Sequence, residues 1–331
     1  MATVLGVDGG GTKTQAVILD EQGHVLGTGV GGPSNYDDVG QRAAQEGIGQ
    51  AVDAARRMAG LPARCFASVF LGMAGVVSPQ DRQVIRDIAQ ALDLAAPDAI
   101  GVDHDCRIAL AGGLTGRPGI VQIAGTGSST FGRNAAGEAW RSGGWGHLLA
   151  DEGSGYWLGM QAMIAAVRSY DGRLPHTPLE ERVLAELGLA DMNEIMHRLY
   201  VDRLSRSEIA RLGPLVLVAA AEGDAHARAL VRQGCDDMAE CVLAVARRLG
   251  MDNGPSELAL VGGIFRGGDV VLAPFEDAVH ARLPRCRVTP AELPPVLGAG
   301  VLALERLGIA IDEQVFCALQ VGAQTQAAQG I

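Results

Sequence analysis

Two glycine-rich turns with hydroxyl side chains are the strongest candidates for chemistry in this sequence. The first spans residues 6–14 (GVDGGGTKT) and the second spans residues 124–130 (AGTGSST). Glycine lets backbone N–H groups come close to an anion, and threonine adds a hydroxyl donor. A plain hairpin turn needs only two residues with positive φ, so three glycines flanked by Asp8 and Lys13 exceed what a turn requires. We interpret the pair as two phosphate-binding hairpins.

Two other nucleotide-binding patterns do not fit. The sequence contains no GxxxxGK[ST] motif, and the first glycine turn joins a strand to a strand rather than to a helix. A GxGxxG match at Gly27, Gly29 and Gly32 runs into a Pro-Ser-Asn loop instead of opening a helix. A dinucleotide fingerprint requires that helix, so we reject this match.

Carboxylates follow a predicted strand in the segment Val102-Asp103-His104-Asp105. Carboxylates at a strand end beside a phosphate loop suit metal binding or proton transfer. A solvated turn or a helix N-cap before residues 106–111 explains the same residues equally well, and the spacing does not decide between them. Asp151 and Glu152 precede a predicted helix near Ser154, and we expect one of the two to cap it.

The elements that must position these residues alternate between strands and helices, which indicates a layered α/β protein. The second strand–glycine turn–strand pattern repeats the first and suggests duplicated lobes. A chain of 331 residues also exceeds the usual size of a single core. The predicted strands are 4–7, 15–19, 24–29, 66–71, 99–103, 120–124, 129–133, 257–261 and 286–289. The predicted helices are about 44–55, 80–92, 268–282 and 296–307, with a largely helical stretch over 154–249 that breaks near 173–175; the pattern after Phe316 is undecided.

Charge and cysteine content exclude several classes of function. The net charge of −11, with no basic run to offset it, opposes binding to nucleic acid or to an anionic membrane. The first residues lack a signal-peptide pattern, and no apolar run reaches membrane-spanning length, so we expect a cytoplasmic protein. The six cysteines are scattered without the spacing of zinc ligands, which predicts reduced thiols; they are Cys65, Cys106, Cys235, Cys241, Cys286 and Cys317.

Taken together, these stretches resemble the actin/hexokinase/heat-shock ATPase superfamily, and within it the N-acetylglucosamine kinase and BadF/BadG ATPase group. The stretches that carry the resemblance are VDGGGTKT (7–14), GGPSN (31–35), AGTGSS (124–129), GGWGHLLADEGSGYWLG (143–159), LVGGIF (260–265) and VLGAGVLAL (296–304). The resemblance implies two actin-like (ribonuclease H-like) α/β lobes with an interlobe cleft. Residues 1–115 and about 295–331 would form one lobe, and residues 116–294, with a helical insertion, the other.

The resemblance also implies an activity, namely the MgATP-dependent phosphorylation of an amino sugar. N-acetylglucosamine, converted to its 6-phosphate, is the first choice, and glucosamine and N-acetylmuramic acid are alternatives. A BadF-type ATPase that activates a partner enzyme is an alternative from another class, as is a nucleotide or sugar sensor without turnover. The iron–sulfur activators of this fold carry a cysteine loop that this sequence lacks, which disfavours the activator. The expected partners are a small sugar and a second copy of the chain.

Site roles follow from the same resemblance. Asp105 would be the general base on the sugar hydroxyl, and Asp8 would hold Mg²⁺ largely through waters. The nucleotide would contact Gly10, Gly11, Thr12, Lys13, Thr126, Gly127, Gly262 and Gly263. The sugar would contact Asn35, Ser128, Ser129, Gly144, Trp145, Gly146 and Asp151. Trp145 suits either stacking on a sugar ring or plugging the lobe. We expect His147 to orient its neighbours by hydrogen bonds rather than to bind a metal.

Overall fold

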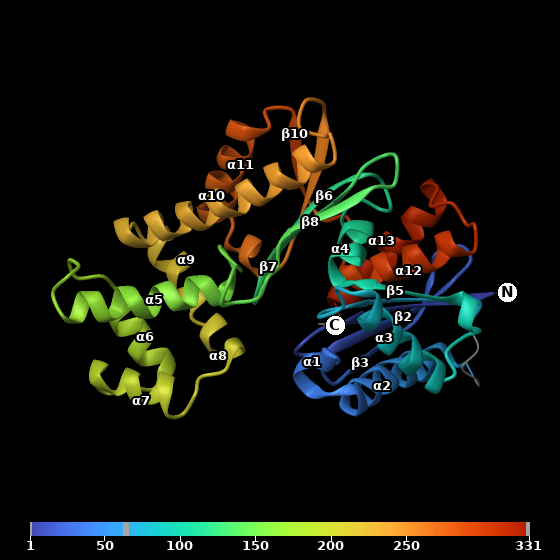
Figure 1. Cartoon of the computed structure of the whole chain (residues 1–331), viewed down its shortest axis with the longest axis horizontal. Helices are drawn as coiled ribbons and strands as arrows, with labels where there is room; N and C mark the ends of the chain where they lie inside the picture. The colour runs from blue at the N-terminus through green and yellow to red at the C-terminus, as the bar shows by residue number, and fades with distance from the viewer. Residues whose placement is uncertain (1, 62–65, 329–331) are drawn as a thin grey trace. The chain divides into compact units, whose positions relative to one another are not determined.

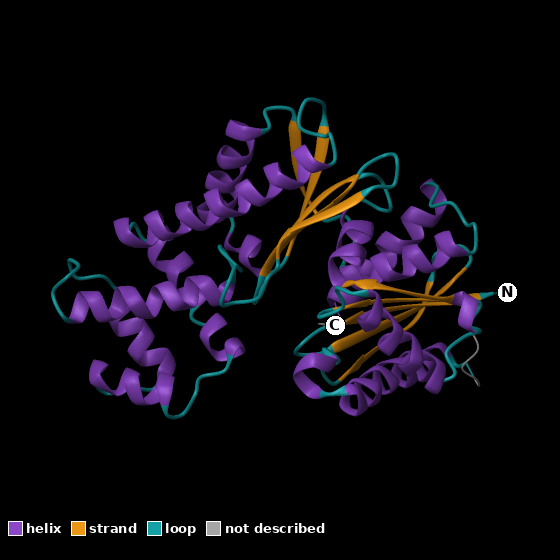
Figure 2. Cartoon of the chain, viewed as in Figure 1, coloured by secondary structure: helices purple, strands orange, loops and turns teal. Residues whose placement is uncertain are grey.

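The structure, a computed structural model, describes residues 2–61 and 66–328. Its contacts divide the chain into two compact units: Met1–Pro118 with Pro290–Ile331 (unit 1), and Gly119–Thr289 (unit 2). Each unit contains one five-stranded sheet with helices packed on it (Figures 1 and 2). The prediction of a two-lobed α/β fold is therefore confirmed. Cys65 lies outside the described residues.

The sheet of unit 1 has the order β3-β2-β1-β4-β5. β1 pairs with β2, and β2 with β3, in antiparallel fashion, whereas β4 runs parallel to β1 and to β5. The carboxyl ends of β1, β4 and β5 therefore meet at one edge of the sheet. The five strands are β1 (Thr3–Gly9), β2 (Thr14–Asp20), β3 (Val25–Gly31), β4 (Ser68–Met73) and β5 (Ile100–His104).

Apolar residues alternate between the two faces of this sheet, as the two-residue period of a strand requires. In β1, Leu5 packs into a cluster with α2 and α3, and its neighbour Val4 packs into a second cluster with α12. Figure 1 shows α2 and α3 on one face and α4, α12 and α13 on the other. These helices are α2 (Gln41–Ala59), α3 (Pro79–Ala91), α4 (Asp105–Gly113), α12 (Pro295–Arg306) and α13 (Glu313–Ala328), with the short α1 (Tyr36–Val39) before α2.

Glycines allow the closest contacts between helices and this sheet. A Cβ at Gly6 of β1 would lie 2.4 Å from the backbone nitrogen of Gly300 in α12. A Cβ at Gly27 or Gly29 would lie 2.2 or 2.1 Å from a backbone oxygen of α2. The rejected GxGxxG match thus includes glycines with a packing role.

The sheet of unit 2 repeats this topology. Its order is β10-β9-β6-β7-β8, in which β6, β7 and β8 form an antiparallel meander and β9 lies parallel to β6. No strand was predicted over β8, because its residues AWRSG are half-buried or exposed and lack an apolar run. The strands are β6 (Gly119–Ala124), β7 (Ser128–Arg133), β8 (Ala139–Gly143), β9 (Ser256–Val261) and β10 (Cys286–Pro290).

Helices fill the region between β8 and β9, as predicted. Ser154 and Asp224 cap α5 and α10, each accepting a hydrogen bond from a backbone N–H of the first turn. The predicted break near 173–175 falls between α5 and α6. The helices of unit 2 are α5 (Gly155–Tyr170), α6 (Leu179–Leu187), α7 (Ile195–Tyr200), α8 (Arg206–Ala210), α9 (Gly213–Ala221), α10 (Ala225–Arg248) and α11 (Asp269–Arg282). Among the described residues, no helix has the length and hydropathy needed to cross a membrane.

Candidate active site

Two carboxylates approach one another at the carboxyl edge of the unit 1 sheet. Asp8 lies near the end of β1, and Asp105 follows the end of β5. Gly72 of β4 pairs in register with Asp8 on one side and with Asp103 on the other. A Cβ at Gly72 would lie 2.5 Å from the Ile108 side chain of α4. Since in-register neighbours point the same way, the side chain of Asp8 faces the helix that begins with Asp105.

Asp103 and Asp105 have different environments. β5 ends at His104, and Asp105 is the first residue of α4, where a carboxylate stabilises the helix dipole. Its Oδ1 accepts the N–H of Cys106 at 2.8 Å, whereas its Oδ2 accepts no hydrogen bond from the described chain. Asp103 instead forms an ion pair with Arg82 at 2.8 Å and accepts the N–H of His104 at 2.9 Å. Asp105 therefore has an oxygen available for a ligand.

Burial and the neighbouring charge of Asp105 raise the pKa of Asp8 to about 7, and Lys13 opposes this shift. A pair of carboxylates at close range favours protonation of one of them. A divalent cation would relieve the same repulsion, and Mg²⁺ binds through few carboxylates and several waters. The surroundings of Asp8 therefore fit the magnesium that the sequence resemblance implies.

The first glycine turn is tied to the loop that follows β3. The N–H of Gly10 donates to the Lys13 carbonyl at 3.0 Å, and the Gly10 carbonyl accepts the N–H of Ser34 at 3.0 Å. The hydroxyl of Thr14 donates to the Gly32 carbonyl at 2.7 Å. In contrast, the N–H groups of residues 11–13 make no hydrogen bond within the described chain, and all three residues are exposed. These three N–H groups, rather than that of Gly10, are available to an anion.

Asn35 follows this loop and holds an unused acceptor. Its Nδ2 donates to Asp38 at 2.6 Å, but its buried Oδ1 accepts no hydrogen bond among the described residues. A Cβ at Gly75 would lie 2.4 Å from that oxygen, so a glycine makes room for it. Buried polar atoms without a partner are rare in folded proteins, and a hydroxyl or amide donor of a ligand would satisfy this one.

Unit 2 also contains a buried carboxylate, that of Asp151, and its backbone is strained. Asp151 has a φ of 70°, which is unfavourable for an aspartate, and is 2% exposed. Its Oδ1 accepts the N–H of Ser128 at 3.2 Å, and its Oδ2 accepts from the Arg206 guanidinium at 2.6 Å. A Cβ at Gly127 would lie 2.3 Å from that guanidinium. Backbone strain of this kind tends to occur at functional sites.

Arg206 was not predicted as a site residue. It lies 55 residues beyond Asp151, at the start of α8, and no local pattern marks it. The expectation that Asp151 or Glu152 caps the next helix was wrong, because Ser154 accepts the Trp157 N–H as the cap of α5. The carboxylate of Asp151 is directed to Ser128 and Arg206 instead.

The second glycine turn contacts both α5 and the end of β9. The carbonyls of Gly125 and Thr126 accept the N–H groups of Gly155 and Tyr156, at 2.8 and 3.1 Å. Gly262 has a φ of 118°, and a Cβ there would lie 2.2 Å from the Ala124 carbonyl oxygen. Because β6 and β9 are parallel, Thr126, Gly127, Gly262 and Gly263 follow their carboxyl ends at the same edge.

The loop after β8 carries the remaining predicted sugar contacts. Gly144 has a φ of 67°, and a Cβ there would lie 2.7 Å from the Ser129 hydroxyl. The Ser128 hydroxyl donates to the Glu152 carbonyl at 2.7 Å. Trp145 is 68% exposed, with the Arg141 guanidinium 5.4 Å from its ring centre, so it does not plug the core of unit 2. Gly146, which follows it, also has positive φ, at 83°.

His147 packs against an aromatic ring in this loop. Its ring contacts Tyr156 edge-on at 4.9 Å, and it makes no hydrogen bond within the described chain. The expected orienting role through hydrogen bonds is therefore replaced by a ring contact.

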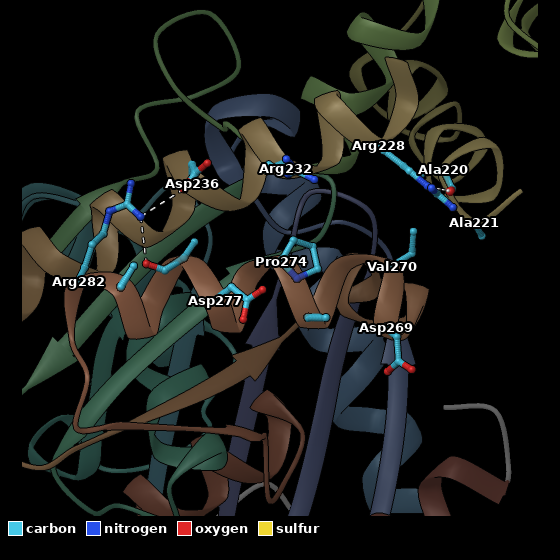
Figure 3. Close-up of a pocket in the computed structure, with 13 residues that line it drawn as sticks. Ala220, Ala221, Arg228, Arg232, Asp236, Asp269, Val270, Pro274, Asp277 and Arg282 are labelled. Atoms are coloured by element: carbon cyan, nitrogen blue, oxygen red, sulfur yellow. Dashed lines mark hydrogen bonds and ion pairs between the residues drawn. The ribbon is translucent and has the colours of Figure 1, made fainter. Parts of the chain in front are cut away.

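A separate hollow of about 770 Å³ lies between α10 and α11 in unit 2 (Figure 3). Arginines and aspartates line it over an apolar floor, and Arg282 pairs with Asp236 at 3.2 Å. Arg228 donates to the Ala220 carbonyl at 2.9 Å. The hollow contains none of the predicted site residues.

The duplicated sheets, each with a glycine turn after its first strand, define an actin-like α/β protein. A family model matches residues 5–303, and the chain belongs to the BadF/BadG/BcrA/BcrD ATPase family.

Known proteins resemble the chain over most of its length. An N-acetylmuramic acid/N-acetylglucosamine kinase of Clostridium acetobutylicum is 31% identical over 92% of this chain and 98% of the relative. An N-acetyl-D-glucosamine kinase of Dictyostelium discoideum is 28% identical over 91% of this chain and 97% of the relative. A crystal structure from Chromobacterium violaceum, provisionally assigned as an N-acetylglucosamine kinase, has 31% identity and a TM-score of 0.72 over 92% of this chain and 99% of that one.

The raised pKa of Asp8 predicts a pH-dependent effect of the variant Asp8→Asn on stability. Below the ordinary pKa of 3.8, Asp8 is protonated in both the folded and the unfolded chain. Between 3.8 and about 7 Asp8 ionises only in the unfolded chain, so the stability of the wild type falls with rising pH. Above about pH 7 this loss of stability is complete and stays constant. Asparagine does not ionise, so the variant avoids this loss of stability.

Without metal, the melting temperature of Asp8→Asn should therefore exceed that of the wild type by a margin that grows up to about pH 7 and then levels off. A stability change of 1 kcal/mol moves the melting temperature by about 2–4 °C in domains of 150–250 residues, so scanning calorimetry can detect it. A margin that does not change with pH would contradict the raised pKa.

Proposed function

We propose that the protein is an ATP-dependent kinase of an amino sugar, with N-acetylglucosamine as the first candidate substrate. The names of its relatives support this proposal. The observation that carries it is the edge of the unit 1 sheet, where Asp105 keeps a carboxylate oxygen uncommitted and Asp8 and Asp105 repel one another. The first glycine turn follows the same strand as Asp8 and offers three uncommitted N–H groups.

The proposed reaction consists of one proton transfer and the displacement of ADP from the γ-phosphorus. Asp105 accepts the proton of the sugar hydroxyl, the hydroxyl oxygen attacks the γ-phosphorus of ATP, and ADP leaves with the electrons of the broken bond. Phosphoryl transfer depends mainly on positioning and charge neutralisation. Magnesium, held by Asp8, would neutralise phosphate charge when bound.

Nucleotide contacts come from both units in this proposal. The N–H groups of residues 11–13 and the hydroxyl of Thr12 bind phosphate oxygens from unit 1. Thr126 and Gly127 do the same from unit 2, and Gly262 and Gly263 contact the adenosine. Gly263 has open space where a Cβ would lie, which leaves its backbone accessible.

Sugar contacts are assigned by the same reasoning. The unsatisfied Oδ1 of Asn35 accepts a hydrogen bond from a sugar hydroxyl or amide. Ser129 and Asp151 contribute from unit 2, with Asp151 held in place by Arg206. Ser128, Gly144, Trp145 and Gly146 complete the set. We also retain the proposals of a cytoplasmic location and a homodimer.

A screen of acceptors tests the proposed activity. The release of ADP should depend on an added amino sugar and should be fastest with N-acetylglucosamine, compared with glucosamine, N-acetylmuramic acid and neutral hexoses. One small substituent changes binding by only about 1–3 kcal/mol, so several amino sugars should give turnover. Hydrolysis of ATP at a rate that no sugar changes would instead favour an ATPase that acts on a partner enzyme.

A glycine substitution in the first turn separates ligand binding from folding. In Gly11→Val the new side chain has room, since a Cβ lies 3.6 Å from the nearest side-chain atom, Asp38 Oδ2. It should nevertheless obstruct a phosphate. We expect ATP affinity to fall about 10- to 100-fold, equivalent to one hydrogen bond to a charged group, while the melting temperature stays near that of the wild type.

The matched control is Gly9→Ala. Its Cβ would lie 2.3 Å from the buried Met73 side chain and 2.6 Å from the Ser34 hydroxyl, so this variant should lower the melting temperature. Calorimetric titration with ATP and thermal unfolding provide the two measurements. Unchanged ATP affinity in Gly11→Val would show that the turn has no role in binding.

The assignment of the base is tested with two asparagine variants. Asp105→Asn keeps the shape of the side chain but cannot accept the proton, so kcat should fall by about 10²-fold or more. Sugar and MgATP should still bind. Asp103→Asn weakens an ion pair with Arg82 and should reduce kcat far less. If Asp103→Asn loses turnover and Asp105→Asn keeps it, the base has been assigned to the wrong carboxylate.

A further inference from the structure

The proposed base, Asp105, and its two neighbours in sequence bring three different donor atoms close together. One ring nitrogen of His104, a carboxylate oxygen of Asp105 and the Sγ of Cys106 all lie within 4.8 Å of one another. The Cys106 thiol is 3.4 Å from the Oδ1 of Asp105. His104 and Asp105 are half-buried, and Cys106 is buried.

The change from strand to helix produces this convergence. Consecutive side chains of a strand point to opposite faces of the sheet. Here β5 ends at His104 and α4 begins at Asp105, so the chain turns between these residues and the three side chains gather. A thiol in the first turn of a helix is also placed where the helix dipole favours its thiolate.

These donors suit a different metal from the one proposed at Asp8. Zinc binds nitrogen, sulfur and oxygen ligands, and sites with three protein ligands leave a fourth position for water. Magnesium prefers oxygen ligands alone. The surrounding carboxylates also favour a cation, because Asp8 and Asp103 lie near this cluster. One nearby guanidinium, that of Arg82, is paired with Asp103. Lys13 is the cation that lowers the pKa of Asp8 against the effects of burial and Asp105.

We propose that His104, Asp105 and Cys106 form an inhibitory site for a thiophilic divalent cation, with Zn²⁺ as the first candidate. On binding, the Cys106 thiol releases its proton to solvent as the sulfur–zinc bond forms, and water completes the coordination. The inhibition rests on the proposed function, since the metal occupies the carboxylate assigned to the proton transfer. The binding itself does not depend on that assignment.

Binding is tested first, with the full chain, Co²⁺ as a spectroscopic substitute for Zn²⁺, and no nucleotide. The wild type should give thiolate-to-cobalt charge-transfer absorption that Zn²⁺ removes. Cys106→Ser should lack this absorption. In His104→Gln the affinity should fall about tenfold or more, since even changes outside the ligand set cost metal sites 10- to 100-fold. The control is Cys317→Ser, which removes an exposed thiol elsewhere and should behave as the wild type.

Activity is tested next, with excess Mg²⁺, saturating ATP and buffered Zn²⁺, each rate being normalised to the same variant without zinc. The wild type and Cys317→Ser should be inhibited alike, and Cys106→Ser and His104→Gln should need about tenfold more Zn²⁺ or more. A high sugar concentration should protect the wild type, because the acceptor hydroxyl competes for Asp105.

The outcomes separate this proposal from the proposed function. Sugar phosphorylation without a thiolate–cobalt signal, or with equal zinc sensitivity in all variants, overturns the metal site and leaves the kinase intact. A thiolate–cobalt signal that is lost in Cys106→Ser, in a protein that phosphorylates no sugar, supports the metal site and overturns the kinase.

Discussion

The repulsion between Asp8 and Asp105 is the constraint to which much of unit 1 responds. Two carboxylates at one sheet edge are costly unless a proton or a cation compensates them, and burial increases that cost. The surrounding structure partly compensates the negative charges at this edge. Arg82 neutralises Asp103, Lys13 counteracts the charge on Asp8, and the first turn of α4 receives Asp105 where a negative charge is favourable. Gly72 keeps the strand between the two carboxylates free of a side chain. In the proposed function, this edge would bind a hydrated cation through Asp8 and supply the proton acceptor, Asp105.

Unit 2 has the same strand order, but its buried carboxylate is compensated within the chain. Its buried carboxylate, Asp151, is compensated by Arg206 and by the N–H of Ser128, so it needs no external cation. Asp151 forms this ion pair with a positive φ, and the absence of a side chain at Gly127 leaves room for both partners. Since only the Asp151 side of this pair is buried, the loss of Arg206 would leave a buried carboxylate with less compensation, which is costly. Unit 2 therefore offers fixed donors and a rigid carboxylate, whereas unit 1 offers a carboxylate pair whose charge depends on what is bound.

The position of the proposed base has a chemical consequence of its own. Asp105 stands between an imidazole and a thiol in sequence, and the strand–helix junction brings all three donors together. The oxygen donors available to magnesium at Asp8 and the mixed donors at His104 and Cys106 differ in softness, so the two kinds of cation are separated by ligand chemistry rather than by distance. The proposed proton acceptor thus belongs to a donor set whose imidazole and thiol would suit a thiophilic metal.

Local features of the chain were predictable because neighbouring residues encode them. The alternation of apolar residues in β1 and β2, the glycine turns and the repeated strand–turn–strand pattern depend on backbone conformation over a few residues, and the two-sheet fold followed from them. The edge strand β8 was missed because half-exposed residues leave no such pattern. Ser154 rather than Asp151 caps α5, and the Asp151 carboxylate is held instead by Arg206, 55 residues beyond it. The unsatisfied oxygen of Asn35 and the available N–H groups of residues 11–13 likewise depend on contacts between distant segments. The sequence by itself determined which elements form and which residues are chemically capable; only tertiary packing decided which of their atoms remain uncommitted, because a hydrogen bond is used or left free according to partners that lie far away along the chain.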